Sequence, residues 1–161
     1  MTQEDKQLLL KDLSARWLYG TIISVTDGNI KYNAYIESVS YKNIQVSPVS
    51  DSNFTAYTFY KISEIKPYLR LMSSITEEEA KEIAILHDIK DILSVKVTSD
   101  YVEVIVDDSV CSTETRTIWF DEIISSIEIF DWFNARHFDY RGLIPKGLAI
   151  EVTEENNPYK K

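Results

Sequence analysis

The chain has 161 residues and a net charge of −9 at pH 7, and 44% of its residues are hydrophobic and 12% aromatic. This composition excludes a disordered or fibrous chain. With one cysteine, no secretory signal and no apolar run near the roughly 20 residues that span a bilayer, we expect a cytoplasmic protein without a membrane segment.

The charge is unevenly distributed along the chain. Residues 1–70 carry a net charge of +1 and residues 71–161 carry −10. An acidic second half repels phosphates, so we expect no nucleic-acid partner. The acidity either suits a basic protein partner or serves solubility alone.

The first 20 residues predict one amphipathic helix. Thr2 can cap it, Gly20 can end it, and Asp12 is expected on a polar face. Its apolar residues recur at helical spacing: Leu8, Leu9, Leu13 and Trp17. The helix should lie on whatever the following residues build.

The next fifty residues change to an alternating, β-branched pattern. Short strands are expected at 21–26, 29–40, 41–46 and 55–65. A two-residue hairpin is predicted at Asp27-Gly28, and Lys66-Pro67 should close the region. Several short strands after one helix favour a small antiparallel, SH3-like sheet that resembles a barrel.

The second half predicts another mixed unit. Thr76 and Glu79 form a capping box for a helix over 77–90 with Ala80, Ile83 and Ala84 inside. The remaining elements are expected in this order: a hairpin of 95–98 and 101–106, a strand at 114–120, a helix over 122–138, a short strand at 148–152 and a frayed tail at 153–161. We therefore expect an α+β fold with two subdomains, 1–70 and 71–161.

Tyrosine and lysine residues gather in the first β-rich region, where they are candidate ligand or partner contacts. They are Tyr32, Tyr35, Tyr41, Tyr57 and Tyr60, interleaved with Lys31, Lys42 and Lys61. A sheet that exposes them could stack a base or sugar and offset a phosphate, or anchor a protein partner. The structural alternative is that tyrosine simply packs well on strands.

Residues 131–142 form a second candidate segment, rich in aromatic and charged side chains. Its candidate contacts are Arg136, His137, Tyr140 and Arg141. His137 with Asp131 or Asp139 would be the minimum of a general-base pair. The favoured interpretation is structural: a helix end that packs Phe133 and Phe138 inward, with arginines paired to acids.

Other chemistry has little support in the sequence. His87 near Asp88 and Asp91 lacks the three convergent ligands of a zinc or iron site. Cys111 has no neighbouring His or Lys to activate its thiol, and the glycines are isolated, so no phosphate loop occurs. We expect no catalytic residues, no metal and no cofactor.

Three stretches resemble a known group of proteins: residues 1–13 (MTQEDKQLLLKDL), 65–79 (IKPYLRLMSSITEEE) and 131–149 (DWFNARHFDYRGLIPKGLA). They are similar to small uncharacterised proteins that bacteriophages and integrated mobile elements carry in gut Bacteroides-type bacteria. The resemblance implies a mobile-element context. It implies no activity and no functional residues.

The sequence favours a non-enzymatic binding protein of phage or mobile-element origin that acts on a host protein. The alternative is a protein that binds or sequesters a small nucleotide-type ligand. A His/Asp hydrolase is a weaker alternative.

Overall fold

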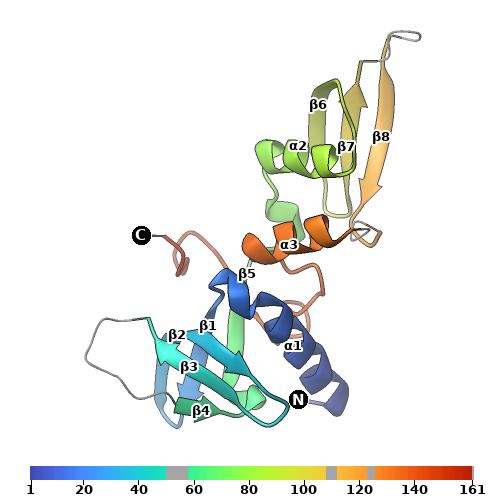
Figure 1. Cartoon of the computed structure of the whole chain (residues 1–161). Helices are drawn as coiled ribbons and strands as arrows, with labels where there is room; N and C mark the ends of the chain where they lie inside the picture. The colour runs from blue at the N-terminus through green and yellow to red at the C-terminus, as the bar shows by residue number, and fades with distance from the viewer. Residues whose placement is uncertain (50–57, 108–111, 123–125, 161) are drawn as a thin grey trace. The chain divides into compact units, whose positions relative to one another are not determined.

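The computed structural model describes residues 1–49, 58–107, 112–122 and 126–160. It confirms an α+β fold, with helices and two separate sheets (Figure 1). The chain divides into two compact units. Unit 1 contains residues 1–70 and 134–161, and unit 2 contains residues 71–133.

The C-terminal residues belong to unit 1, whereas we expected them in the second subdomain. Two long-range pairings explain this difference. The last strand pairs in parallel with residues 68–69, and Arg70 forms a β-bridge with Phe138. The redrawn boundary sharpens the charge asymmetry: residues 71–133 hold fifteen acidic and four basic side chains, a net charge of −11, and the rest of the chain carries +2.

Unit 1 begins with α1 (Gln3–Arg16) and a 3-10 helix, η1 (Trp17–Tyr19). The expected cap is confirmed, because Thr2 accepts a hydrogen bond from the Asp5 N–H and the Asp5 carboxylate accepts one from the Thr2 N–H. Gly20 ends the segment with a φ of +65°, as expected. Trp17 is 42% exposed and not part of the apolar stripe, since the tighter 3-10 turn rotates it away from the α-helical face.

The sheet of unit 1 has the order β4-β3-β2-β1-β5-β9. Its strands are β1 (Ile22–Asp27), β2 (Ile30–Val39), β3 (Ile44–Pro48), β4 (Thr58–Tyr60), β5 (Ile65–Leu69) and β9 (Ile150–Glu151). Strands β1 to β4 form an antiparallel meander, and β5 returns to pair with β1. The small antiparallel sheet is confirmed, and none of the pairings in the described residues closes it into a barrel.

Three local expectations in this region need correction. The hairpin turn is Gly28-Asn29, because Asp27 pairs with Ile30. The strand expected at 55–65 is divided between β4, a 3-10 helix η2 (Ile62–Glu64) and β5, and residues 50–57 lie outside the described part. Pro67 does not end the sheet but lies in β5, where it pairs with β1. The strand on the other side of β5, β9, begins to pair only at Tyr68. Pro67 is therefore in an edge position, where its missing N–H is tolerated.

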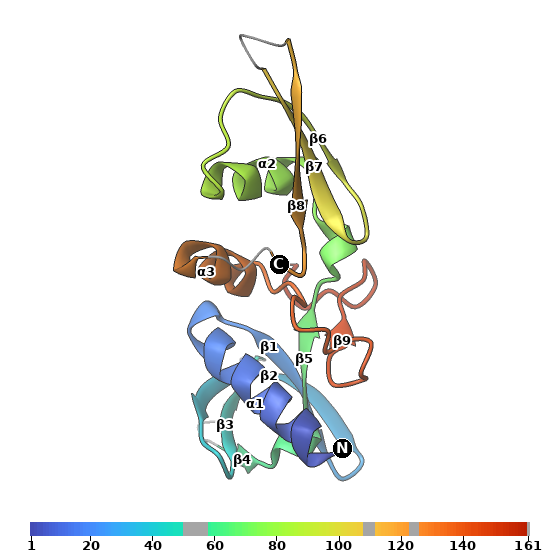
Figure 2. The same ribbon diagram turned by 90° about the vertical axis from the view of Figure 1, so that its right-hand side faces the viewer.

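One face of the sheet carries the core of unit 1. Leu9 and Leu13 of α1 are fully buried against inward residues of β1 and β2, and residues of the C-terminal segment complete the cluster. Figure 2 shows α1 lying across this face. The other apolar members are Ile23, Val25, Ala34, Ile36, Ile44, Val46, Tyr60, Ile65, Leu69, Leu143, Leu148 and Ala149.

Unit 2 is built from a three-stranded antiparallel sheet and helices. It contains η3 (Met72–Ser74), α2 (Glu77–Leu86), β6 (Ile92–Val97), β7 (Tyr101–Val106), β8 (Glu114–Trp119) and most of α3 (Ile127–Ala135). The sheet order is β6-β7-β8, and α2 packs on β6. Val102, Val104 and Val106 are buried together, as the alternating pattern predicted.

Helices α2 and α3 both end earlier than expected, for the same reason. The Thr76–Glu79 capping box is confirmed, but α2 stops at Leu86 and Asp88 takes a left-handed φ of +56°. Helix α3 stops at Ala135, and His137 has a φ of +60°. These residues leave the right-handed helical region, so the chain turns instead of continuing the helix. The expected start of this helix near residue 122 falls beside residues 123–125, outside the described part.

Candidate functional site

Unit 1 contains a cavity of about 500 Å³, which we call the lysine pocket. It is lined by Gln3, Lys6, Gln7, Leu10, Tyr41, Lys42, Lys61, Ile62 and Ser63. Its size falls within the range of small-molecule sites in proteins, about 300–1,000 Å³. The lining comes from α1, the β2–β3 turn and η2.

Local structure fixes each wall of the lysine pocket. Gln3, Lys6, Gln7 and Leu10 follow i, i+3, i+4, i+7 spacing and so share one face of α1. In the β2–β3 turn, the Ser40 hydroxyl donates to the carbonyl of Asn43 at 2.7 Å and accepts from its N–H at 3.1 Å. These bonds hold the two intervening pocket residues, Tyr41 and Lys42, in a tight turn.

The third wall is held by a carboxylate that does not line the cavity. Glu64 Oε2 accepts the Lys61 N–H at 2.8 Å, and the Glu64 N–H donates to the Lys61 carbonyl at 2.9 Å. This reciprocal pair closes η2 and places Lys61, Ile62 and Ser63 at the rim. The backbone of the pocket is therefore largely preformed.

The charge of the lysine pocket is uniformly positive. Lys6, Lys42 and Lys61 line it, and no acidic residue does so among the described residues. Leu10 and Ile62 are half-buried and pack against the core cluster, which gives the pocket an apolar floor. An arrangement of three ammonium groups over an apolar floor suits a ligand with an anionic end and a flat or apolar end.

An exposed aromatic ring stands beside these lysines. Tyr41 is 80% exposed, and Lys42 Nζ lies 5.3 Å from the centroid of its ring. An accessible aromatic face can stack on a base or sugar. The ring thus adds a contact for the uncharged part of a ligand.

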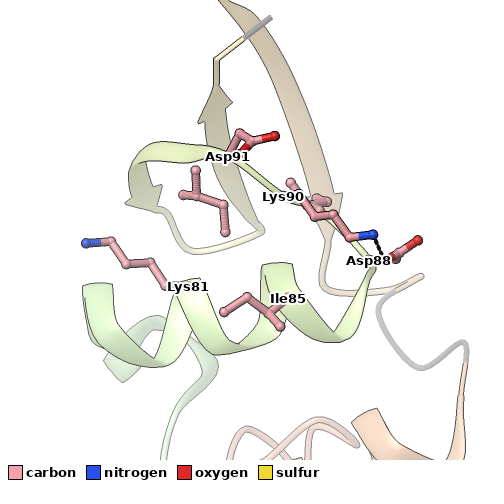
Figure 3. Close-up of a pocket in the computed structure, with 7 residues that line it drawn as sticks. Lys81, Ile85, Asp88, Lys90 and Asp91 are labelled. Atoms are coloured by element: carbon pink, nitrogen blue, oxygen red, sulfur yellow. Dashed lines mark ion pairs between the residues drawn. The ribbon is translucent and has the colours of Figure 1, made fainter.

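A second cavity, in unit 2, has a different character. It measures about 390 Å³ and lies where α2 passes into β6 (Figure 3). Its charges are mixed: Lys90 pairs with Asp88 at 3.3 Å, and Lys81 and Asp91 also line it. Because its positive and negative groups offset each other, this cavity offers a weaker field for a charged ligand than the lysine pocket does.

The tyrosines and lysines predicted from the sequence do not share one face. Tyr32 and Tyr60 lie on the core side, where their hydroxyls bond at 2.8 Å and the Tyr60 hydroxyl also donates to Asp27 at 3.2 Å. Tyr35 and Lys31 occupy the opposite face of β2, since side chains alternate along a strand. Tyr57 lies outside the described residues. Of the predicted tyrosines and lysines, Tyr41, Lys42 and Lys61 line the lysine pocket.

A buried charge cluster joins α1 to the C-terminal segment of unit 1. Asp12 and Arg16 are both fully buried, and Arg16 Nε donates to Asp12 at 2.7 Å. Arg16 also donates to the carbonyl of Phe138 at 2.6 Å, and Arg141 Nε lies 3.3 Å from the Asp12 carboxylate. The helix face expected to be polar is therefore part of the interior. Burial raises the pKa of Asp12, and the Arg16 guanidinium opposes this shift.

The aromatic-charged segment packs around this cluster. The Tyr140 hydroxyl donates to the side chain of Asn134 at 2.9 Å, and the Arg16 guanidinium lies 4.9 Å from the Tyr140 ring centroid. Arg141 pairs with an acidic residue, as expected, but that residue is Asp12 of α1, which lies outside residues 131–142. Arg136 is half-buried in the turn after α3. Tyr140 and Arg141 are thus tied to the fold and lie outside the lysine pocket.

His137 is enclosed between β1 and the C-terminal tail. Its Nδ1 lies 3.2 Å from the Thr21 hydroxyl, and its ring stacks on Tyr159 with centroids 4.0 Å apart. Burial, with the nearby charges of Arg16 and Arg70, lowers the pKa of His137 to about 4. The Asp139 carboxylate accepts the backbone N–H groups of Leu143 and Ile144 at 2.8 and 2.7 Å. The structure therefore gives His137 a hydroxyl partner and uses Asp139 to close a turn.

The tail, which we expected to fray, is anchored by the Tyr159 hydroxyl. This group accepts the N–H of Ile22 at 3.2 Å and donates to the carbonyl of Tyr68 at 2.9 Å. It thereby bridges β1 and β5 one residue beyond their last direct pair, Ile23 with Pro67. Sequence reasoning missed this bridge, and no local pattern around residue 159 signals it.

The described residues include no group of three or more His, Cys, Asp or Glu side chains placed to hold a metal ion. None of their helices has the length and apolar character needed to cross a membrane. Comparison with protein-family models, curated proteins and solved structures found no match to this chain. The resemblance to mobile-element proteins stays a prediction.

Proposed function

We propose that this chain is a non-enzymatic binding protein whose unit 1 binds a small anionic, nucleotide-type ligand in the lysine pocket. One observation carries the proposal: Lys6, Lys42 and Lys61 converge on a cavity of about 500 Å³ whose described lining has no acidic residue. The cavity lies in unit 1, which carries a net charge of +2, whereas the chain as a whole carries −9.

The lining supports binding more than catalysis. It contains amines, amides, a hydroxyl and a phenol, with no carboxylate, imidazole or thiol among the described residues. Gln3 and Gln7 supply donors and acceptors that could read a sugar or base edge. The lysines act as point charges for phosphate, and Tyr41 offers a stacking face.

Isothermal titration with adenosine monophosphate tests the proposal, with adenosine and inorganic phosphate as partial ligands. The nucleotide should bind more tightly than either part, because it engages both the lysines and the apolar floor. Affinity should fall as salt rises, since exposed ammonium–phosphate contacts are screened. Equal, salt-independent weak binding of all three compounds contradicts the proposal.

Charge-reversal variants locate the site. K42E and K61E should each weaken binding by about 2- to 5-fold or more, because an exposed ion pair contributes about 0.2–1 kcal/mol and reversal adds repulsion. K31E is the matched control: Lys31 is exposed on β2 and does not line the lysine pocket. An equal loss in K31E would show a general charge effect and contradict a defined pocket.

The acidity of unit 2 supports a second candidate function, binding to a basic host protein. Residues 71–133 carry a net charge of −11. A surface of one sign speeds and orients association with a partner of opposite sign. Capture by a purified basic protein, such as lysozyme, is not specific enough as a test. The discriminating measurement is a pull-down from host lysate in which the wild type retains one host protein. The single variants E77K and E78K, in unit 2, should lose that protein, whereas K42E, in unit 1, should keep it.

A further inference from the structure

The two edges of the sheet in unit 2 differ in how they are protected. Edge strand β6 has a register irregularity between Ile92 and Ser94, and α2 packs on it. Edge strand β8 pairs with β7 over six consecutive residues, from Glu114 to Trp119, without any shift. Figure 1 shows β8 as an outer strand of this sheet. Bulges, prolines and charged side chains, lysine above all, commonly protect edge strands. Strand β8 has no bulge, proline or lysine, and its charged residues are one acid and one base, Glu114 and Arg116.

Most of the outward backbone groups along this edge belong to threonines. The Phe120 N–H donates to the Asp100 carbonyl at 2.9 Å, so Asp100 and Phe120 are a hydrogen-bonded pair of the antiparallel ladder. Since hydrogen-bonded pairs alternate, Glu114, Arg116 and Ile118 direct their N–H and C=O groups toward β7. Thr115, Thr117 and Trp119 of β8, and Thr113 just before it, therefore direct theirs away from the sheet, where a further strand could bond to them.

The sequence of this edge is self-complementary. Residues 113–117 read Thr-Glu-Thr-Arg-Thr. When this sequence is read from its C-terminal end, the threonines keep their positions and Glu and Arg exchange places. An antiparallel copy therefore sets threonine opposite threonine and Glu opposite Arg. Glu114 and Arg116 lie on one face, bonded at 3.1 Å, with side chains 49% and 48% exposed. The threonines occupy the other face, and those of β8 proper are exposed.

We infer that a second copy of the chain pairs with this edge, β8 against β8, antiparallel and centred on Thr115. In this register Thr115 faces Thr115 of the second copy, and each Thr113 faces a Thr117. Each Glu114 faces an Arg116, so four charges alternate in sign across the join. Cross-strand threonine pairs and opposite-charge pairs both stabilise antiparallel sheets. The outward threonine groups supply about six backbone hydrogen bonds.

Neighbouring registers fit less well. A two-fold axis perpendicular to the sheet requires a residue to face its own copy. Centring on Arg116 sets two guanidinium groups against each other, and centring on Thr117 sets Arg116 opposite Ile118. Like charges directly opposite destabilise a sheet. The charge pattern thus selects Thr115 as the centre and a second copy as the occupant.

Size-exclusion chromatography with light scattering tests this inference on the full chain. The wild type should have twice the 18.6 kDa mass of one chain at high micromolar concentration. Buffer of about 0.15 M salt is used, where a Debye length of about 8 Å screens repulsion between the acidic units. E114R and R116E should each be monomeric, because each places like charges opposite one another. K31E, with the same charge change as R116E but in unit 1, should stay dimeric.

Mixing the two variants is the decisive step. Combining E114R with R116E restores opposite charges at both positions, so an equimolar mixture should recover the dimer mass that neither variant has alone. The double variant E114R/R116E should also dimerise. A monomeric wild type overturns the inference, as do single variants that remain dimeric or a mixture that stays monomeric.

Discussion

The buried pair of Asp12 and Arg16 gives a sharp test of the interior of unit 1. Both side chains are fully buried, and Asp12 also lies 3.3 Å from Arg141. Changing Asp12 to Ala removes the carboxylate that accepts a hydrogen bond from Arg16. The Phe138 carbonyl, bonded to Arg16 at 2.6 Å, stays in place. Removing one partner of a buried ion pair costs about 3–5 kcal/mol. We expect D12A to destabilise unit 1 by that amount.

Native-state hydrogen exchange measures this loss in unit 1 separately from unit 2. The amides of Ile23 and Val25, in the core of β1, should exchange at least 100-fold faster in D12A, as about 3 kcal/mol requires. The double variant D12L/R16M should recover most of the stability, since apolar replacement of a buried pair is often neutral. K90A, which removes an exposed pair with Asp88, is the control and should change exchange little. A loss below about 1 kcal/mol in D12A would refute the reasoning.

Three further predictions concern other parts of the fold. Because the pKa of His137 is about 4 in the folded chain against 6.5 for the free side chain, the unfolded state binds more protons between these values, and unit 1 should lose about 2–3 kcal/mol as pH falls from 6.5 to 4. H137N keeps a residue that tolerates positive φ, and its free energy of unfolding in urea should depend less on pH than that of the wild type. An unchanged pH dependence would show that His137 is not the group responsible. Y159F should cost about 1–2 kcal/mol and speed exchange of the Ile22 amide, which loses its acceptor, whereas unaltered Ile22 protection would disprove the bridge. T76A should destabilise α2 by about 1 kcal/mol with faster exchange of the Glu79 amide, and equal exchange would show that the cap contributes nothing.

Features governed by neighbours a few residues apart could be predicted from the sequence. The caps at Thr2 and Thr76 and the hairpin around Ser99-Asp100 follow from local hydrogen bonds. Their energies depend on the chain within a turn or two, so the pattern is sufficient. Helix ends were less predictable, because the left-handed turns at Asp88 and His137 carry no glycine.

Features governed by distant contacts could not be predicted. Asp12 appeared to belong to a polar helix face, and only the approach of residues 138–141 makes that face interior. Its i, i+4 relation to Arg16 was a usable signal, but such pairs usually lie on the surface. The lysine pocket combines three chain segments: Lys42 and Lys61 belonged to the predicted tyrosine–lysine region, whereas Lys6 joins them only because α1 crosses the sheet.

Mapping the nucleotide by amide chemical shifts tests the central claim most directly. Adenosine monophosphate is titrated into ¹⁵N-labelled protein, and each backbone amide is followed. The account predicts saturable shifts at residues 3–10, 41–42 and 61–63, which line the lysine pocket, and none in the cavity formed by residues 81–92. Shifts confined to unit 2, or no saturable shift at millimolar nucleotide, would contradict it.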